Sequence, residues 1–152
     1  PLSRTHARGK AGVMDETVVA EKLESLRRCI RRIEAKRPAT VAELETDADL
    51  QDILSLNLTR AVQIAVDIAT HLLSDSDLPA PETMGQAFRQ LATDGAMPSD
   101  LAESMVAAVG FRNVAVHSYR SIDWNIVHAI CHERLEDFGA FARHVADRLA
   151  AR

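Results

Sequence analysis

The sequence predicts an all-α protein, an up-and-down bundle of about five helices, from three observations. Apolar residues recur at spacings of three and four over long stretches, which is the period of a helix with one buried face. The 152 residues include only 6 Gly and 5 Pro, and aromatic residues make up 4%, which argues against a small β-barrel or sandwich. Apolar residues reach 47%, enough for the core of one folded domain.

The first half of the chain predicts two long helices joined by a short one. The first covers about residues 15–36 and ends before Pro38. Its apolar stripe consists of Val19, Leu23, Leu26, Ile30 and Ile33. Thr40 and Glu43 have the spacing of a capping box, which begins the short helix. The second long helix covers about residues 49–72, where apolar residues again follow the helical period.

The second half predicts three further helices after a polar loop with two prolines. A short helix covers about residues 84–92 and is stopped by Asp94 and Gly95, since glycine favours the backbone conformation that ends a helix. Pro98 marks the start of the next helix. The last helix runs from about residue 123 to residue 149. Long amphipathic helices with short links are typical of a bundle.

The chain is expected to form one domain over residues 14–152. Residues 1–13 have no apolar period, so we interpret them as a disordered leader or an expression remnant. No apolar run approaches the roughly 20 residues of a membrane span. Cys29 and Cys131 lie far apart and make no disulfide framework, which suits a cytoplasmic protein.

The formal charge of the chain is −4, from 18 basic and 22 acidic residues. Without the three cations of residues 1–13 the balance is 15 against 22, or −7. Binding of nucleic acid therefore requires a local basic patch. The end of the first helix carries such a cluster, with Glu34 as its single acid: Arg27, Arg28, Arg31, Arg32, Lys36 and Arg37. The cluster is either a solvated face that complements a helix C-terminus or a surface for an RNA backbone.

Residues 110–123 hold the densest group of chemically active side chains, with Arg112, Asn113, His117 and Tyr119 in eight positions. Arg112 and His117 are five residues apart, which corresponds to about 140° of rotation on an ideal helix. The two side chains would therefore not share a face. Their convergence requires either a break in the helix, for which Gly110 is a candidate, or a second copy of the chain.

An arginine and a histidine together can cleave RNA without a metal ion. A neutral imidazole can take the proton from a ribose 2′-hydroxyl, because its pKa lies near neutral pH. A guanidinium can hold two phosphate oxygens and offset the charge of the transition state. One motif lacks a general acid for the leaving oxygen, and a two-fold dimer would supply it. By spacing alone, His117 can equally be a structural histidine that satisfies a hydrogen bond in the core.

The segment RNVAVHSY resembles the R-x4-H-x-Y signature of the HepT-like ribonuclease toxins, which belong to the HEPN superfamily. The segments LNLTRAVQIAVDIATHLL, AFRQLATDGAMPSDLAESMVAAVGFRN and YRSIDW are also similar to that family, so the resemblance covers about residues 15–148. It implies a homodimeric HEPN helical bundle whose two motifs face a shared cleft. It also implies a metal-independent RNA endonuclease, acting on tRNA or mRNA, with Arg112 and His117 as the catalytic pair and no cofactor.

The resemblance further implies a partner, a minimal nucleotidyltransferase antitoxin of the MntA type. That antitoxin would transfer AMP from ATP onto Tyr119 and so add bulk and negative charge near Arg112. Tyr119 can alternatively be a core residue with a bonded hydroxyl. The chain has no glycine-rich phosphate loop, so we do not expect it to bind ATP by itself.

Four further residues are candidates for supporting roles. Asn113 can orient either catalytic partner or make a hydrogen bond within the helix turn. Asn57 and Arg60 share one face of the second long helix and either reach the dimer cleft or, for Arg60, pair with an acid. Asp67 faces His71 one turn later, which predicts a buried carboxylate–imidazole support in preference to a metal pair.

Two alternative interpretations compete with the ribonuclease. The chain could be a non-catalytic HEPN bundle that serves as the binding subunit of a nucleotidyltransferase, or a plain helical adaptor. An intact Arg112, His117 and Tyr119 set favours the toxin, because a scaffold has no need of it. His128 and His132 have the spacing of zinc ligands, but no third ligand is evident and we interpret them as surface histidines, so no metal site is expected.

Overall fold

The computed structural model describes residues 15–152, and every regular element in that range is a helix. The leader expected at residues 1–13 and Met14 lie outside the described residues. The elements, in chain order, are α2 (Glu16–Lys36), α3 (Val41–Glu45), α4 (Ala48–Leu73), α5 (Met84–Thr93), α6 (Ser99–His117), η1 (Tyr119–Ser121), α7 (Trp124–Ala129), η2 (Ile130–Arg134) and α8 (Leu135–Ala150). The predicted all-α bundle is confirmed.

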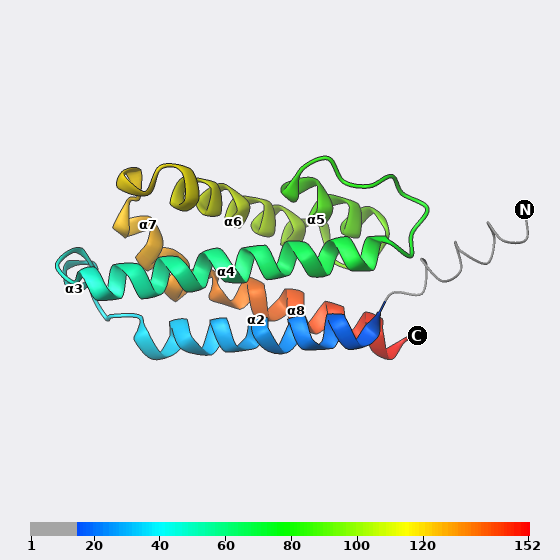
Figure 1. The fold of residues 1–152 in the computed structure, drawn as a ribbon, viewed down its shortest axis with the longest axis horizontal. Coiled ribbons are helices and arrows are strands. Elements are labelled where there is room, and N and C mark those ends of the chain that lie inside the picture. The colour runs from blue at the N-terminus through cyan, green and yellow to red at the C-terminus, as the bar shows by residue number, and fades with distance from the viewer. Residues whose placement is uncertain (1–14) are drawn as a thin grey trace, which may run out of the picture.

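The helices lie roughly along one axis, with α4 in the middle of the bundle (Figure 1). In this view α2 lies below α4, α5 and α6 lie above it, and α8 lies behind. The short elements α3 and α7 close the left end. The C-terminus lies at the opposite end, where Arg152 forms an ion pair with Glu16 at the start of α2. The central helix α4 is therefore the element against which the other helices are positioned.

The helix boundaries follow the local signals in the sequence. The Asp15 carboxylate caps α2 by accepting hydrogen bonds from the backbone N–H groups of Thr17 and Val18, at 3.0 and 3.2 Å. The Thr40 hydroxyl accepts from the Glu43 N–H at 3.3 Å and starts α3. After α5 the chain turns at Gly95, whose φ of 81° is a conformation that favours glycine. The predicted bounds of α2, α4 and α5 are correct to within one residue.

The core lies between α4 and the surrounding helices. Phe88 of α5 and Phe141 of α8 are fully buried, and their rings meet edge to face with centroids 5.6 Å apart. The predicted apolar stripes point inward: Val19, Leu23, Leu26 and Ile33 of α2 are buried, and Ile30 is partly buried. Burial of these stripes is the main force that holds the bundle together.

The structure corrects one expectation about the helix that carries the motif. Gly110 does not break it, because α6 runs without interruption from Ser99 to His117. No atom lies within 4 Å of the position that a Cβ on Gly110 would occupy, so the glycine opens onto free space. A single helical glycine costs only about 1 kcal/mol relative to alanine, too little to end a helix whose preceding residue, Val109, is buried.

The last helix contains a π-helical segment, η2, that the periodicity did not predict. At this segment the guanidinium of Arg37 donates a 2.8 Å hydrogen bond to the carbonyl oxygen of Cys131. A π segment loosens the regular hydrogen-bond ladder, so a carbonyl becomes available to a side chain from elsewhere. Among the helices that the structure describes, none is long and apolar enough to span a membrane.

Candidate active site at the end of α6

The C-terminal end of α6 holds the motif that the sequence singled out. The helix ends at His117, and the backbone N–H of Ser118 still bonds to the carbonyl of Val114 at 2.8 Å. The chain then makes the tight turn η1, which begins with Tyr119, and returns to the core through the buried Ile122. Arg112, Asn113 and His117 therefore lie on the last two turns of one helix, with Tyr119 just beyond it.

The guanidinium of Arg112 is held by two amides. Its Nη1 donates to the side-chain oxygen of Asn113 at 3.2 Å, and its Nη2 donates to that of Gln63 on α4 at 3.4 Å. Its Nε is buried without a partner. Within the described residues no carboxylate pairs with Arg112. The charge is positioned without being neutralised, which is the state that an anion-binding arginine needs.

Gln63 joins Arg112 to a chain of polar contacts that the sequence analysis did not foresee. The Gln63 amide donates to Asp67 at 3.1 Å, and Asp67 forms an ion pair with Lys22 of α2 at 3.5 Å. The support expected between Asp67 and His71 is wrong: the Asp67 side chain is 42% exposed and its partners are Gln63 and Lys22. The only hint in the sequence is the spacing of Gln63 and Asp67, four residues apart on one helix face.

His117 is exposed, and no side-chain hydrogen bond or ion pair ties it to any other residue of the described chain. Because α6 is a regular helix, His117 points about 140° away from Arg112 around the axis. The structure therefore does not bring the two side chains together within one copy. Two of the exposed apolar side chains are Leu56 of α4, which is 50% exposed, and Val116 of α6, which is 47% exposed.

Tyr119 is half-exposed, and its hydroxyl donates a 2.8 Å hydrogen bond to the carboxylate of Asp52 near the start of α4. Its ring meets that of Trp124 edge to face, with centroids 6.1 Å apart. Burial raises the pKa of the Tyr119 hydroxyl, and the Asp52 carboxylate raises it further. Asp52 and Gln63 are eleven residues apart, or about 16 Å along the helix. The residues of α4 that hold Tyr119 and Arg112 are therefore about three turns apart along that helix.

The structure places Asn57 and Arg60 in a separate groove between α2 and α4. Asn57 is buried, and its amide donates to the carbonyl of Ile53 at 2.8 Å. Arg60 is exposed and pairs with no acid within the described part of the chain. The ion pair that was one of the two roles expected for Arg60 is therefore not formed. Neither residue contacts Arg112 in this single copy.

The two histidines with zinc-ligand spacing have another structural role. The ring nitrogens of His128 and His132 contact the carbonyl oxygens of Ala39 and Pro38, at 3.2 and 2.8 Å. These contacts hold the link between α2 and α3 against α7 and η2. Across residues 15–152, no three His, Cys, Asp or Glu side chains gather as a metal site would require.

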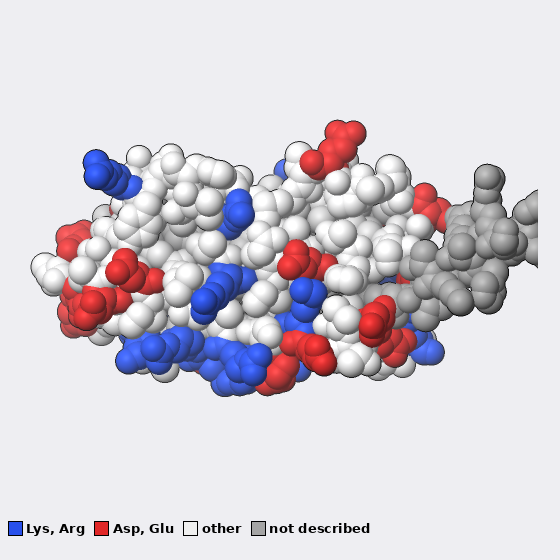
Figure 2. All heavy atoms as spheres, in the orientation of Figure 1, with Lys and Arg blue, Asp and Glu red and all other residues white. Residues whose placement is uncertain are grey.

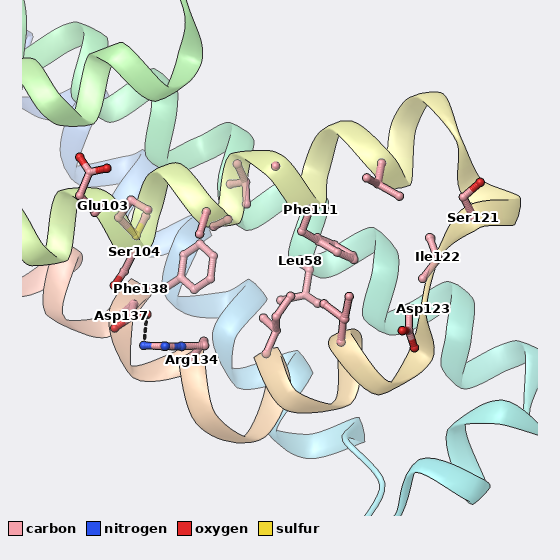
Figure 3. Close-up of a pocket in the computed structure, with 18 of the residues that line it drawn as sticks. Leu58, Glu103, Ser104, Phe111, Ser121, Ile122, Asp123, Arg134, Asp137 and Phe138 are labelled. Atoms are coloured by element: carbon pink, nitrogen blue, oxygen red, sulfur yellow. Dashed lines mark ion pairs between the residues drawn. The ribbon is translucent and has the colours of Figure 1, made fainter.

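A second concavity, of about 610 Å³, lies between α6 and the α7–α8 region (Figure 3). Leu58, Phe111 and Phe138 contribute apolar wall, and the ion pair of Arg134 with Asp137 lies at one side. Arg112 does not line this cavity. The one cation in its lining, Arg134, is paired with Asp137, and no residue of the Arg112, His117 and Tyr119 motif lines the cavity.

Comparison with known proteins gives a consistent assignment. Residues 26–145 match the family model described as "Ribonuclease HepT-like". An mRNA nuclease HepT from Shewanella oneidensis is 32% identical over 124 residues, which cover 82% of this chain and 92% of that protein. A tRNA nuclease HepT from Aphanizomenon flos-aquae is 24% identical over 132 residues, which cover 87% and 90% of the two chains.

The fold is also similar to that of a solved toxin. The tri-AMPylated HEPN toxin of Shewanella oneidensis, in complex with an MNT antitoxin, superimposes with a TM-score of 0.81 at 30% identity, and the match covers 88% of this chain and 99% of the toxin. The family model spans most of the described bundle, including α4, α6 and the motif. This chain therefore belongs to the HepT-like ribonuclease family, within the HEPN toxins.

Proposed function

We propose that this chain is the toxin of a toxin–antitoxin pair and an RNA endonuclease that needs no metal ion. The observation that carries the proposal is the Arg112 guanidinium, fixed by the amides of Gln63 and Asn113 without a carboxylate, on the helix that ends in the exposed His117. Family membership supports a ribonuclease, and relatives described as mRNA and tRNA nucleases support an RNA substrate.

The proposed reaction is a transfer within the RNA backbone. His117 takes the proton from a ribose 2′-hydroxyl, and the oxygen attacks the adjacent phosphorus. The bond from phosphorus to the 5′-oxygen breaks, and this oxygen takes the proton from the imidazolium that His117 has become. The products are a 2′,3′-cyclic phosphate and a 5′-hydroxyl. Arg112 binds the non-bridging oxygens and stabilises the extra negative charge of the transition state.

The catalytic pair is proposed to come from two copies of the chain. Arg112 and His117 of one copy point about 140° apart on α6, so one helix does not aim both at the same phosphate. A two-fold dimer brings Arg112 of one copy opposite His117 of the other and creates two equivalent sites. The exposed Leu56 and Val116 supply apolar surface for that contact.

The proposed partner is a minimal nucleotidyltransferase of the MntA type, because a similar toxin is found AMPylated and in complex with an MNT antitoxin. The Tyr119 oxygen would attack the α-phosphorus of ATP, pyrophosphate would leave, and Asp52 is placed to accept the phenolic proton. Since the anchors of Tyr119 and Arg112 are about 16 Å apart on α4, the added AMP would block the path of RNA to the site. It would not replace the phosphate on Arg112 itself.

The ribonuclease proposal is tested by incubating the purified chain with RNA in excess EDTA. We expect cleavage that leaves 2′,3′-cyclic phosphate ends, no cleavage by His117→Ala, and unchanged helical content in that variant. Loss of cleavage on chelation would contradict the metal-free mechanism. Intact RNA under all conditions would favour the non-catalytic HEPN bundle.

The regulatory proposal is tested by coexpression with a nucleotidyltransferase of the MntA type. Intact-mass analysis should show added AMP on the wild-type chain, and peptide mapping should place it on Tyr119. Tyr119→Phe should escape modification and remain an active ribonuclease. Inhibition of an unmodified chain would instead indicate a stoichiometric block by the partner.

A further inference from the structure

A groove of about 510 Å³ runs between the outer faces of α2 and α4. Its polar lining is strongly cationic, with Arg28 and Arg32 from α2 and Arg60 from α4. Cys29 lies in the same lining, and burial raises the pKa of its thiol while the charges of Arg60 and Arg28 lower it. The guanidiniums of Arg28 and Arg60 therefore both lie near the thiol of Cys29. Positive charge from two helices, α2 and α4, lines one groove.

These three arginines differ from their neighbours in having no acidic partner. Arg27 and Arg31, on the same helix, both form ion pairs with Glu24, at 3.8 and 3.3 Å. Arg28 donates to the neutral hydroxyl of Ser25 at 3.1 Å, and no carboxylate in residues 15–152 pairs with Arg28, Arg32 or Arg60. Unpaired like charges held together repel one another, so a bound anion would stabilise this arrangement.

The cationic groove, defined by Arg28, Arg32 and Arg60, leads toward the candidate active site. Arg60 and Gln63 are neighbours on one face of α4, and Gln63 accepts the hydrogen bond of Arg112. Figure 2 shows Lys and Arg side chains gathered over α2, with further ones above them over α4 and α6 on the same face. Acidic side chains gather at the left end of this face, and others lie beside the cationic side chains over α2 and α4 and further to the right.

We propose that the cationic groove binds the phosphate backbone of the RNA substrate next to the bond that is cut. This inference rests on the proposed ribonuclease function and adds the surface that holds the strand. Guanidiniums that contact phosphates alone position RNA without reading its sequence. They also overcome the repulsion expected from a chain with a net charge of −4, because the field near the groove is locally positive.

The test compares two double variants that remove the same charge from the same helix. Arg28→Gln with Arg32→Gln removes the unpaired cations, and Arg27→Gln with Arg31→Gln removes the paired ones as a matched control. The probe is a fluorescent single-stranded RNA with 2′-O-methyl groups, which the proposed reaction cannot cleave, and anisotropy reports its dissociation constant at several salt concentrations.

We expect the Arg28 and Arg32 double variant to bind RNA more weakly and with less dependence on salt. Each phosphate contact on a single strand contributes about 0.7 to the salt slope, so the loss of two lowers it by about 1.4. The ratio of the variant and wild-type dissociation constants should therefore shrink about sevenfold between about 50 mM and about 200 mM salt. Arg60→Gln should lower the slope by about 0.7, and the control pair should behave like the wild type.

Equal affinity and equal salt slope in the wild type and the Arg28 and Arg32 double variant would contradict the proposal. The proposal would also be contradicted if the double variant bound RNA like the wild type but was no longer AMPylated, because the groove would then bind the protein partner. Failure of the ribonuclease function alone is distinguishable, since the wild type would then bind the methylated probe in a groove-dependent way and leave cleavable RNA intact. With cleavable RNA the groove variant should raise KM and lower kcat/KM relative to the control pair, because its arginines hold the strand next to the bond that is cut.

Discussion

The hydroxyl of Tyr119 donates a 2.8 Å hydrogen bond to the carboxylate of Asp52, 67 positions earlier in the chain. Tyr119 is the only tyrosine in the sequence, so its ionisation can be followed without interference. Burial and the Asp52 charge both raise its pKa, which disfavours the phenolate. The same carboxylate that disfavours the phenolate is the nearest acceptor for its proton.

Replacement of Asp52 by Asn should lower the pKa of Tyr119 toward the ordinary value of about 10, because the charge is lost while burial remains. Tyrosinate absorbance during an alkaline titration measures this directly. Glu43→Gln, which removes a charge from an exposed position on α3, serves as the control. An identical titration in the wild type and Asp52→Asn would show that Asp52 does not hold the hydroxyl in solution.

Substitutions at Gln63 should affect RNA cleavage through Arg112. Gln63→Ala removes one of the two amides that fix the guanidinium, a loss of about 0.5–1.5 kcal/mol, or roughly a 2- to 10-fold lower kcat/KM. Gln63→Glu keeps the shape but places a carboxylate against Arg112, so it should raise KM by competing with phosphate. Steady-state cleavage rates and circular dichroism check both variants. Equal KM in Gln63→Glu and wild type would show that Arg112 does not bind the RNA.

The two cysteines should react slowly in the folded chain. Both are buried, and burial raises the pKa of Cys131 to about 12. A maleimide should therefore label neither thiol rapidly at neutral pH and both after denaturation. Because the folded thiol of Cys131 keeps its proton at a pH where the unfolded thiol has lost it, the stability of the fold should fall as pH rises from about 9 to about 12.

The Cys131 contribution can be isolated by comparing the wild type with Cys131→Ala. Urea unfolding at several alkaline pH values should give a smaller loss of stability with pH in the variant. Rapid labelling of native protein at neutral pH would instead mean that the core around η2 opens easily.

Phe88→Ala should destabilise the bundle by about 3–5 kcal/mol, because it leaves a cavity where α5 meets α8 and removes the ring contact with Phe141. Urea denaturation followed by helical circular dichroism measures the change. Ile126→Ala, at an exposed position of α7, should cost much less. A comparable loss in both variants would argue against the core described for α5.

The sequence predicted the helices better than the contacts between them. The bounds of α2, α4 and α5 follow from caps and apolar periods, which act over a few neighbouring residues. The hydrogen bond of Arg112 to Gln63 joins residues 49 positions apart, and no local pattern encodes it. Gly110 was misleading because its cost in a helix is small beside the burial of its neighbours, such as Val109.

The candidate site was predictable in its residue types and not in its geometry. The short spacing of Arg112, His117 and Tyr119 singled out this segment, which lies within the residues that match the family model. The partners Gln63 and Asp52 lie on α4, and Lys22, which pairs with Asp67, lies on α2, so these contacts depend on tertiary packing and not on local sequence.

The measurement that tests the shared cleft most directly is complementation between two inactive variants. Arg112→Ala and His117→Ala should each fail to cut RNA alone. When they are mixed so that protomers exchange, mixed dimers should contain one site with an intact arginine from one copy and an intact histidine from the other. Activity should return to about a quarter of the wild-type rate, because about half of the dimers are mixed and each has one of two sites intact. No recovery, with mixed dimers present by native mass spectrometry, would contradict the account.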